Sequence, residues 1–372
     1  MVKLIDVTGK VVSGEWGNDD LVGNGIPVLR TTNFNNDGTI NYDNIVTRAI
    51  TKTKINDKYL LNGDILIEKS GGSDTKPVGR VVYFEGEEKK YLYNNFTGLL
   101  RIKDKKEWYP KYIFYSLYAN YKRGGTKIYQ NKTTGLHNLK TENYISSFCI
   151  KQIPLQEQVD ICNKLNRIKN IIDKKQLQLV EYAKLTHSLF VEMFINENYP
   201  KKKLGECAII NPKKSSDKRL HDELEVSFVP MMAVGGNGHI NVSEIKKLAD
   251  VKNGFTYFSE GDVLFAKITP CMENGKGAIA SNLCNGIGFG STEFHVIRPI
   301  ENITTSEWIY VLTTLQKFRL SAEANMTGSA GQKRVPASFL QDYSFYLPPI
   351  ELQKQFSRVF KHLDKHKLLI ID

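Results

Sequence analysis

The sequence predicts an α+β protein in which long coiled-coil helices separate two tandem α/β domains, the second helix being short. Three observations lead to this prediction. The 372 residues suit two domains, because one domain usually holds roughly 100–200 residues. Two motifs recur in the same order just over half a chain apart, and the second motif opens a stretch with heptad spacing. We therefore expect a duplicated unit, each copy ending in a helix.

The internal repeat is defined by two motifs. Leu-Asn-Gly-Asp-Ile-Leu at 61–66 returns as Ser-Glu-Gly-Asp-Val-Leu at 259–264, an offset of 198 residues (259 − 61). Ile-Pro-Leu-Gln-Glu-Gln at 153–158 returns as Pro-Pro-Ile-Glu-Leu-Gln at 348–353, an offset of 195 (348 − 153). The predicted boundaries are 1–152 for the first globular domain, 153–198 for the first helix, 199–347 for the second globular domain and 348–372 for the second helix.

Each domain is expected to combine short strands with helices near its end. Runs of β-branched and aromatic residues between turn residues predict strands at 78–84 and 293–297. Helical segments are predicted at 110–121 and 306–324. A proline then precedes each long helix or occupies its first turn, where its missing N–H group does no harm.

The first long helix carries a pattern typical of a coiled coil. Ten positions from 161 to 193 alternate spacings of four and three, and eight of the ten are apolar or aromatic. A long amphipathic helix lying on a globular core is the alternative. The second helix continues the spacing at Phe356 and Phe360 but is about half as long. If the helices pack antiparallel, Phe356 lies near Met193 and Phe360 lies near Leu189.

The shorter second helix leaves part of the first helix without a partner in the chain. An apolar stripe of this length usually marks an interaction site. We therefore predict that another protein chain covers these residues, which are Ile161, Leu165, Ile168 and Ile172.

The charge of the chain indicates a polyanionic partner. The formal net charge is +11 at pH 7, and an excess of Lys and Arg suits nucleic acid. Residues 1–150 hold 22 basic and 16 acidic residues, whereas residues 200–348 hold 17 and 15. The first domain is therefore the stronger candidate for phosphate contacts.

The sequence lacks the local signatures of secretion, metal binding and catalysis. The five cysteines are scattered and form no Cys-x-x-Cys pair, so neither disulfides nor zinc are indicated. There is no signal-like start and no apolar run of about 18 residues, so a reducing cytoplasm is expected. A nucleotide-binding P-loop is missing, and the strings at 211–214 and 347–350 lack the residues of an adenine-methyltransferase motif. We expect a non-catalytic chain with no cofactor or metal of its own.

Equivalent polar loops are the candidate DNA-binding elements. Loops with lysines near both ends follow the Gly-Asp motif at 69–76 and 266–277, and basic segments at 122–132 and 326–334 come later in each repeat. Lys and Arg suit phosphates, whereas amide and hydroxyl groups suit base edges. The predicted DNA-binding residues are Arg30, Lys69, Ser70, Lys76, Lys122, Arg123, Lys127, Lys132, Lys267, Thr269, Asn274, Lys276, Thr292, Gln332, Lys333 and Arg334.

These motifs resemble a known family. The stretch 269–278, Thr-Pro-Cys-Met-Glu-Asn-Gly-Lys-Gly-Ala, followed by Gly-Phe-Gly-Ser-Thr-Glu-Phe at 288–294, resembles a target-recognition domain of type I restriction-modification specificity subunits. Pro-Leu-Gln-Glu-Gln at 154–158 resembles the start of the family's spacer helix. In the first repeat the resemblance is carried mainly by Gly-Ile-Pro-Val-Leu-Arg at 25–30 and by the Gly-Asp motif.

The resemblance implies two domains that each read one half of a bipartite DNA target. It also implies that two modification subunits, which bind S-adenosylmethionine and methylate adenine, dock on the helices, and that restriction subunits with translocase and nuclease activity can join. The stripe that begins at Ile161 would then contact a modification subunit or a second copy of this chain. The short second helix departs from the family's pattern.

Two other functions stay open: the specificity portion of a single-chain restriction-methylation enzyme, and a coiled-coil scaffold that binds no DNA.

Overall fold

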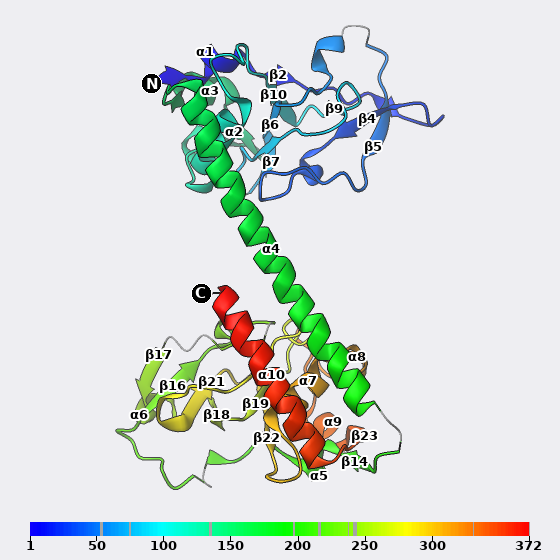
Figure 1. Ribbon diagram of the computed structural model, residues 1–372, viewed down its shortest axis with the longest axis vertical. Helices are drawn as coiled ribbons and strands as arrows, with labels where there is room; N and C mark the ends of the chain where they lie inside the picture. The colour runs from blue at the N-terminus through cyan, green and yellow to red at the C-terminus, as the bar shows by residue number, and fades with distance from the viewer. Residues whose placement is uncertain are drawn as a thin grey trace. The chain divides into compact units, whose positions relative to one another are not determined.

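The fold is mixed α and β, as predicted, and the chain divides into two compact units. The computed structural model describes residues 1–52, 55–73, 76–133, 136–195, 198–214, 217–236, 238–240, 244–329 and 331–371. Unit 1 is Met1–Ile172 and unit 2 is Asp173–Asp372 (Figure 1). Within the described residues, no helix is long and apolar enough to span a membrane.

Unit 1 is built on two four-stranded sheets. One runs in the order β2 (Val12–Ser13), β10 (Thr97–Leu100), β6 (Ile65–Glu68), β8 (Val81–Tyr83), with all neighbours antiparallel. The other runs β3 (Asn18–Asp19), β5 (Val46–Ala49), β4 (Ile26–Leu29), β9 (Leu92–Tyr93), with β4 and β9 parallel. The smaller sheets are β11 (Gln130–Thr133), β12 (Leu136–Leu139), β7 (Ser70–Gly72), and β1 (Val2–Lys3) with β13 (Cys149–Ile150). The helices that precede the long helix are α1 (Leu4–Thr8), α2 (Pro110–Lys122) and α3 (Thr141–Ser147).

Unit 2 repeats this plan. Its first sheet runs β15 (Ala208–Ile210), β22 (Phe294–Pro299), β19 (Val263–Ala266), β20 (Gly277–Ile279). Its second runs β17 (Glu244–Lys247), β16 (Glu225–Val229), β21 (Ile287–Gly290), β18 (Thr256–Ser259), with β16 and β21 parallel. A further pair is β14 (Lys201–Lys203) with β23 (Ser344–Tyr346). The helices are α5 (Leu204–Cys207), α6 (Leu248–Val251), α7 (Ser306–Thr314), α8 (Gln316–Ala324), α9 (Ala337–Asp342) and α10 (Ile350–Ile371).

The strand that follows each Gly-Asp motif lies at the centre of its unit. Side chains alternate between the two faces of a strand, and all four residues of β6 are buried. Ile65 and Ile67 pack in the core that contains α2, whereas Leu66 packs in the core on the other face. In β19, likewise, all four residues are buried. Hydrophobic residues on both faces explain the apolar runs at 65–67 and 263–266.

The Gly-Asp motif forms a turn that is closed by an ion pair. Gly63 has a φ of 96°, which favours glycine. The carboxylate of Asp64 accepts a hydrogen bond from the Leu61 N–H (2.8 Å) and pairs with the Arg101 guanidinium through two bonds of 2.8 and 2.7 Å. Such two-point pairs are strong and directional. The equivalent residues in unit 2 are Gly261, Asp262 and Arg298.

A buried glutamine attaches the long helix α4 (Leu155–Phe194) to unit 1. The Gln158 side chain is fully buried. Its Oε1 atom accepts a hydrogen bond from the Tyr109 N–H (2.9 Å). Its Nε2 group donates to the carbonyl oxygens of Glu107 (2.9 Å) and Ile153 (2.9 Å). One side chain therefore joins the helix, the segment before it and the residue that precedes α2.

Gln353 makes the same three contacts at the start of α10. Its Oε1 atom accepts from the Thr305 N–H (3.2 Å), and its Nε2 group donates to the carbonyls of Ile303 (3.1 Å) and Pro348 (2.9 Å). Thr305 precedes α7 as Tyr109 precedes α2. We call this arrangement the glutamine clamp. The repeated Gln of the sequence is thus a repeated structural contact.

In unit 2, α10 packs against the end of α4, and the contacts are shifted from those expected. Phe356 lies against Phe190 and Phe194, with ring centroids 5.6 and 5.3 Å away. Both α4 rings also contact Trp308 of α7, at 5.9 and 6.4 Å. Met193, the expected neighbour, lies partly buried against the same core. The domain core as well as the helix pair thus determines which face of α4 is buried.

Two predicted elements differ in extent from those in the structure. The helix predicted at 306–324 is broken at Leu315, which has extended dihedral angles (φ −61°, ψ 138°). Before the break, Thr313 and Thr314 donate their hydroxyls to carbonyls three residues earlier, and such local bonds compete with helix geometry. The strand predicted at 78–84 is confined to β8.

We predict that replacing Gln158 with Leu destabilises unit 1. The substitution keeps an apolar stem but leaves one buried N–H and two carbonyl groups without this partner. Because each unsatisfied group costs about 1–3 kcal/mol, the free energy of unfolding should fall by about 2–4 kcal/mol. Urea unfolding followed by tryptophan fluorescence measures this.

The matched control is Gln156→Leu. Gln156 is exposed, and its amide contacts Asp160 (3.0 Å). This change should alter stability by less than about 0.5 kcal/mol. Equal effects of the two substitutions would show that the clamp does not stabilise the unit.

Candidate nucleic-acid interface

In unit 1 the structure joins the two basic segments that the sequence singled out. Strand β7 follows the β6 strand and pairs with β12, which in turn pairs with β11. The Ser70 hydroxyl donates to the Asn138 side chain across the first of these pairs. The loop at 69–76 and the segment at 122–132 therefore meet at one small sheet, although almost 50 residues separate them.

The predicted DNA-binding residues of unit 1 fall into two groups. Lys69 is half-buried, donates to the Ser13 hydroxyl (2.9 Å), and has a pKa lowered by burial. Arg30 donates to the Asn44 carbonyl (3.1 Å). The exposed group pairs with no carboxylate among the described residues and consists of Lys76, Lys122, Arg123 and Lys127. The side chain of Lys132 lies outside the described part of the chain.

In unit 2 the corresponding segments also lie side by side. The Thr269 N–H donates to the Lys333 carbonyl (3.0 Å), and the Val335 N–H donates to the Lys267 carbonyl (2.9 Å). A bridge joins Ile268 and Arg334. The loop after the Gly-Asp strand and the later basic segment thus form one surface here too.

Several predicted DNA-binding residues of unit 2 already form hydrogen bonds or ion pairs with other residues of the unit. Arg334 binds Glu293 through bonds of 2.7 and 2.9 Å, and this guanidinium lowers the pKa of the Glu293 carboxyl. Lys276 donates to the Met231 carbonyl (3.3 Å), and Thr269 donates to Glu273 (2.6 Å). Half-buried Lys267 has a pKa lowered by burial. The exposed residues are Asn274, Thr292, Gln332 and Lys333.

Two arginines that the sequence did not single out shape these surfaces. Arg80 binds Glu68 (3.1 Å) and donates to the carbonyls of Thr31 and Phe34 (both 3.0 Å). Arg319 of α8 donates to the Met272 carbonyl (2.8 Å). Because their partners lie 12 to 49 residues away, no local pattern could have indicated them.

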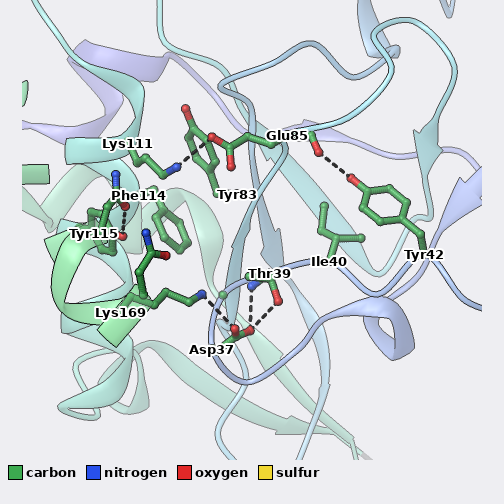
Figure 2. A pocket seen from close by; sticks show the side chains of 13 residues that line it. Asp37, Thr39, Ile40, Tyr42, Tyr83, Glu85, Lys111, Phe114, Tyr115 and Lys169 are labelled. Carbon is green, nitrogen blue, oxygen red and sulfur yellow. Dashed lines mark hydrogen bonds and ion pairs between the residues drawn. The ribbon is translucent and has the colours of Figure 1, made fainter. Parts of the chain in front are cut away.

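A cavity of about 470 Å³ lies in unit 1 beside α4. Tyr83 and Phe114 are among the aromatic side chains that line it (Figure 2). Its charged groups pair with one another: Lys169 with Asp37 (2.9 Å) and Lys111 with Glu85 (2.8 Å). Within the described residues, no group of three or more His, Cys, Asp or Glu side chains could hold a metal ion. The cavity thus offers apolar surface and already paired charges.

Comparison with known proteins identifies relatives of both halves of the chain. The family described as type I restriction modification DNA specificity domain matches residues 2–182 and again 196–371. The specificity subunits of the type I restriction enzymes EcoAI and EcoEI from Escherichia coli are 44% and 42% identical to this chain over 161 residues. That match covers 43% of this chain and 27% of either relative.

Solved structures share the fold at low sequence identity. A chain from work on complex assembly and conformational transition of the type I R-M system matches with a TM-score of 0.50 and 15% identity, over 100% of this chain and 92% of that chain. The type I restriction-modification S subunit from M. genitalium matches with a TM-score of 0.50 and 14% identity, over 99% and 90%. With a family match in each of its two repeats, the chain belongs to the type I restriction-modification DNA specificity family.

Proposed function

We propose that this chain is the DNA-recognition subunit of a type I restriction-modification complex and that each unit reads one half of a bipartite target. One observation carries the proposal. In both units, the loop after the central strand and a later basic segment are joined at equivalent places of the same fold. A duplicated surface suits a target that has two halves.

The exposed side chains of these surfaces have the chemistry for two kinds of contact. Lys122 and Lys127 in unit 1, and Lys333 in unit 2, are exposed and can neutralise phosphates, which contributes affinity that depends on salt and not on sequence. Asn274, Thr292 and Gln332 carry amide or hydroxyl groups that can meet base edges. Residues that are already paired within the unit, such as Arg334, shape the surface but would add little net charge to it.

Chemistry would be supplied by other subunits. We propose that two modification subunits, which bind S-adenosylmethionine and methylate adenine, dock on this chain and that restriction subunits can join them. This chain would select the sequence and position the catalytic subunits, without a reaction of its own. The relatives that share up to 44% identity are named as specificity subunits of restriction enzymes, which supports this division of labour.

The first half of α4 is the proposed docking surface for another subunit. Leu165, Ile168 and Ile172 are 37%, 54% and 50% exposed. Ile161 is half-buried, and with Leu165 it lines a groove of about 370 Å³ against α2. The repeat places Phe356 at the position of Ile161 (356 − 161 = 195), and in unit 2 that residue is covered by Phe190 and Phe194. Apolar side chains of a modification subunit are the proposed cover in unit 1.

We predict that the exposed lysines determine how DNA binding depends on salt. Lys122→Ala, Lys127→Ala and Lys333→Ala should each weaken binding by the assembled complex to any sequence. Each should also reduce the slope of log K against log salt concentration by about one. Titrations of fluorescent duplexes at several salt concentrations measure both effects.

Lys106→Ala is the matched control, because Lys106 is exposed but lies outside the proposed surface. Its slope should equal that of the unsubstituted protein. Unchanged slopes for all three test variants would contradict the assignment of these loops to DNA.

We predict that Ile168→Asp weakens association with the modification subunit at least tenfold, because a carboxylate would have to be buried in an apolar contact. Leu177→Asp is the control: Leu177 is 61% exposed and, nine residues after Ile168 on the same helix, lies on the opposite face of α4. Sedimentation of the mixed subunits measures the affinity.

Hydrogen exchange at 158–175 should also slow when the modification subunit is added. Strong protection in the isolated monomer, or equal effects of both substitutions, would contradict the docking surface.

A further inference from the structure

We infer that Arg319 is a positioning residue that holds the 267–277 loop of unit 2 in the shape that reads DNA. The inference rests on the proposed function and adds a residue that neither the loop sequence nor the family match indicates. Arg319 belongs to α8, more than 40 residues after the loop. It acts through the loop backbone and need not touch DNA.

The guanidinium of Arg319 binds two carbonyl groups of the loop. Its Nη1 group donates to the Met272 carbonyl (2.8 Å), and its Nη2 group makes a longer contact with the Gly275 carbonyl (3.4 Å). The guanidinium carbon lies 4.7 Å from the centroid of the Phe265 ring in strand β19. The planar fork of arginine therefore links the loop to the central strand, and lysine offers no such fork.

This arginine is held in an environment that is unfavourable for a charge. Burial lowers the pKa of Arg319 to about 10. Its Nε atom is buried without a hydrogen-bond partner, and it forms no ion pair with any carboxylate of the described residues. The Arg319 side chain is partly buried, and a charge withdrawn from water without a counter-ion costs stability, so an apolar side chain of similar size would often pack more stably. Arginine supplies N–H donors for the inward-facing carbonyl groups of the loop, and an apolar residue cannot supply them.

The loop has an inner and an outer side. Met272 is fully buried, whereas Glu273 and Asn274 are exposed. Backbone bonds from Asn274 to Pro270 and from Lys276 to Cys271, both 3.0 Å, make a compact turn. Arg319, Asn274 and Gly275 also line a cavity of about 460 Å³, so the turn has space to shift if the fork is removed. A shift would move Asn274, the proposed base contact.

The two units share the backbone pairing at the start of the loop and differ in the residues that follow it. Residues 70–72 form β7, which is hydrogen-bonded to β12. In unit 2 backbone bonds pair only the start of the loop, at 267–269, with the later segment, and the turn beyond them is bound by the partly buried Arg319 guanidinium. Loss of Arg319 should therefore affect the reading of one half-site and not the other.

The test compares Arg319→Met with Phe318→Leu in the complex assembled with modification subunits. Phe318 is the fully buried neighbour in α8 and packs on Phe265 at 5.7 Å between ring centroids, so its truncation weakens the same core without removing the fork. Both complexes methylate a duplex library with randomised half-sites, and sequencing gives the base preference at each position. Thermal unfolding of each variant reports stability.

Arg319→Met should reduce discrimination at least tenfold at one or more positions of a single half-site and leave the other half-site unchanged. Phe318→Leu should lower the unfolding temperature and keep both preferences. Arg319→Lys, which keeps the charge, should also relax the same half-site. If Lys restores the preference, or if Phe318→Leu relaxes it equally, the positioning role is wrong. If the unsubstituted complex has no sequence preference, the proposed function itself fails.

Discussion

The glutamine clamp is the contact on which the rest of the structure depends. Gln158 and Gln353 each satisfy one N–H and two carbonyl groups at the junction of a domain and its long helix. These backbone groups are withdrawn from water, where a missing partner is costly. Once the clamp is made, the rotation of the helix about its axis is set. The clamp thereby determines which helix face meets the domain and which remains available to another chain.

The consequence is visible in the two faces of α4 within unit 1. Gln158 and Cys162 are fully buried against the domain, and Asn166 accepts a hydrogen bond from the Tyr115 hydroxyl (2.6 Å). In the apolar stripe, Ile161 is half-buried beside α2, whereas Leu165, Ile168 and Ile172 are exposed. A partly polar contact holds the helix to its own domain, while the more apolar stripe is left for a partner. This is the opposite of an ordinary amphipathic surface helix, whose apolar face meets its own core.

The sequence sufficed to predict the duplication, the fold class and the long helix, because these depend on patterns within short windows. The Gly-Asp turn and the glutamine recur with their spacing, and both prove to be structural contacts. The packing of Phe356 was less predictable. Heptad spacing indicates Met193 as its neighbour on α4. In the structure Phe356 packs on Phe190 and Phe194, because Phe190 also contacts Trp308 of the domain core. In the candidate site, sequence could locate basic loops but could not show that Glu293 already binds Arg334, since 41 residues separate them. Arg319 left no sequence signal because its role depends wholly on contacts across the fold.

Sequencing of methylated adenines in a host that carries this chain with its modification subunit tests the central claim most directly. Two units with the same fold and the same joined loops should give two short defined half-sites separated by a spacer of fixed length and unspecified sequence. Exchange of residues 1–152 for those of another family member should then change one half-site alone. Methylation at a single continuous site, or a change in both half-sites after the exchange, would contradict the account.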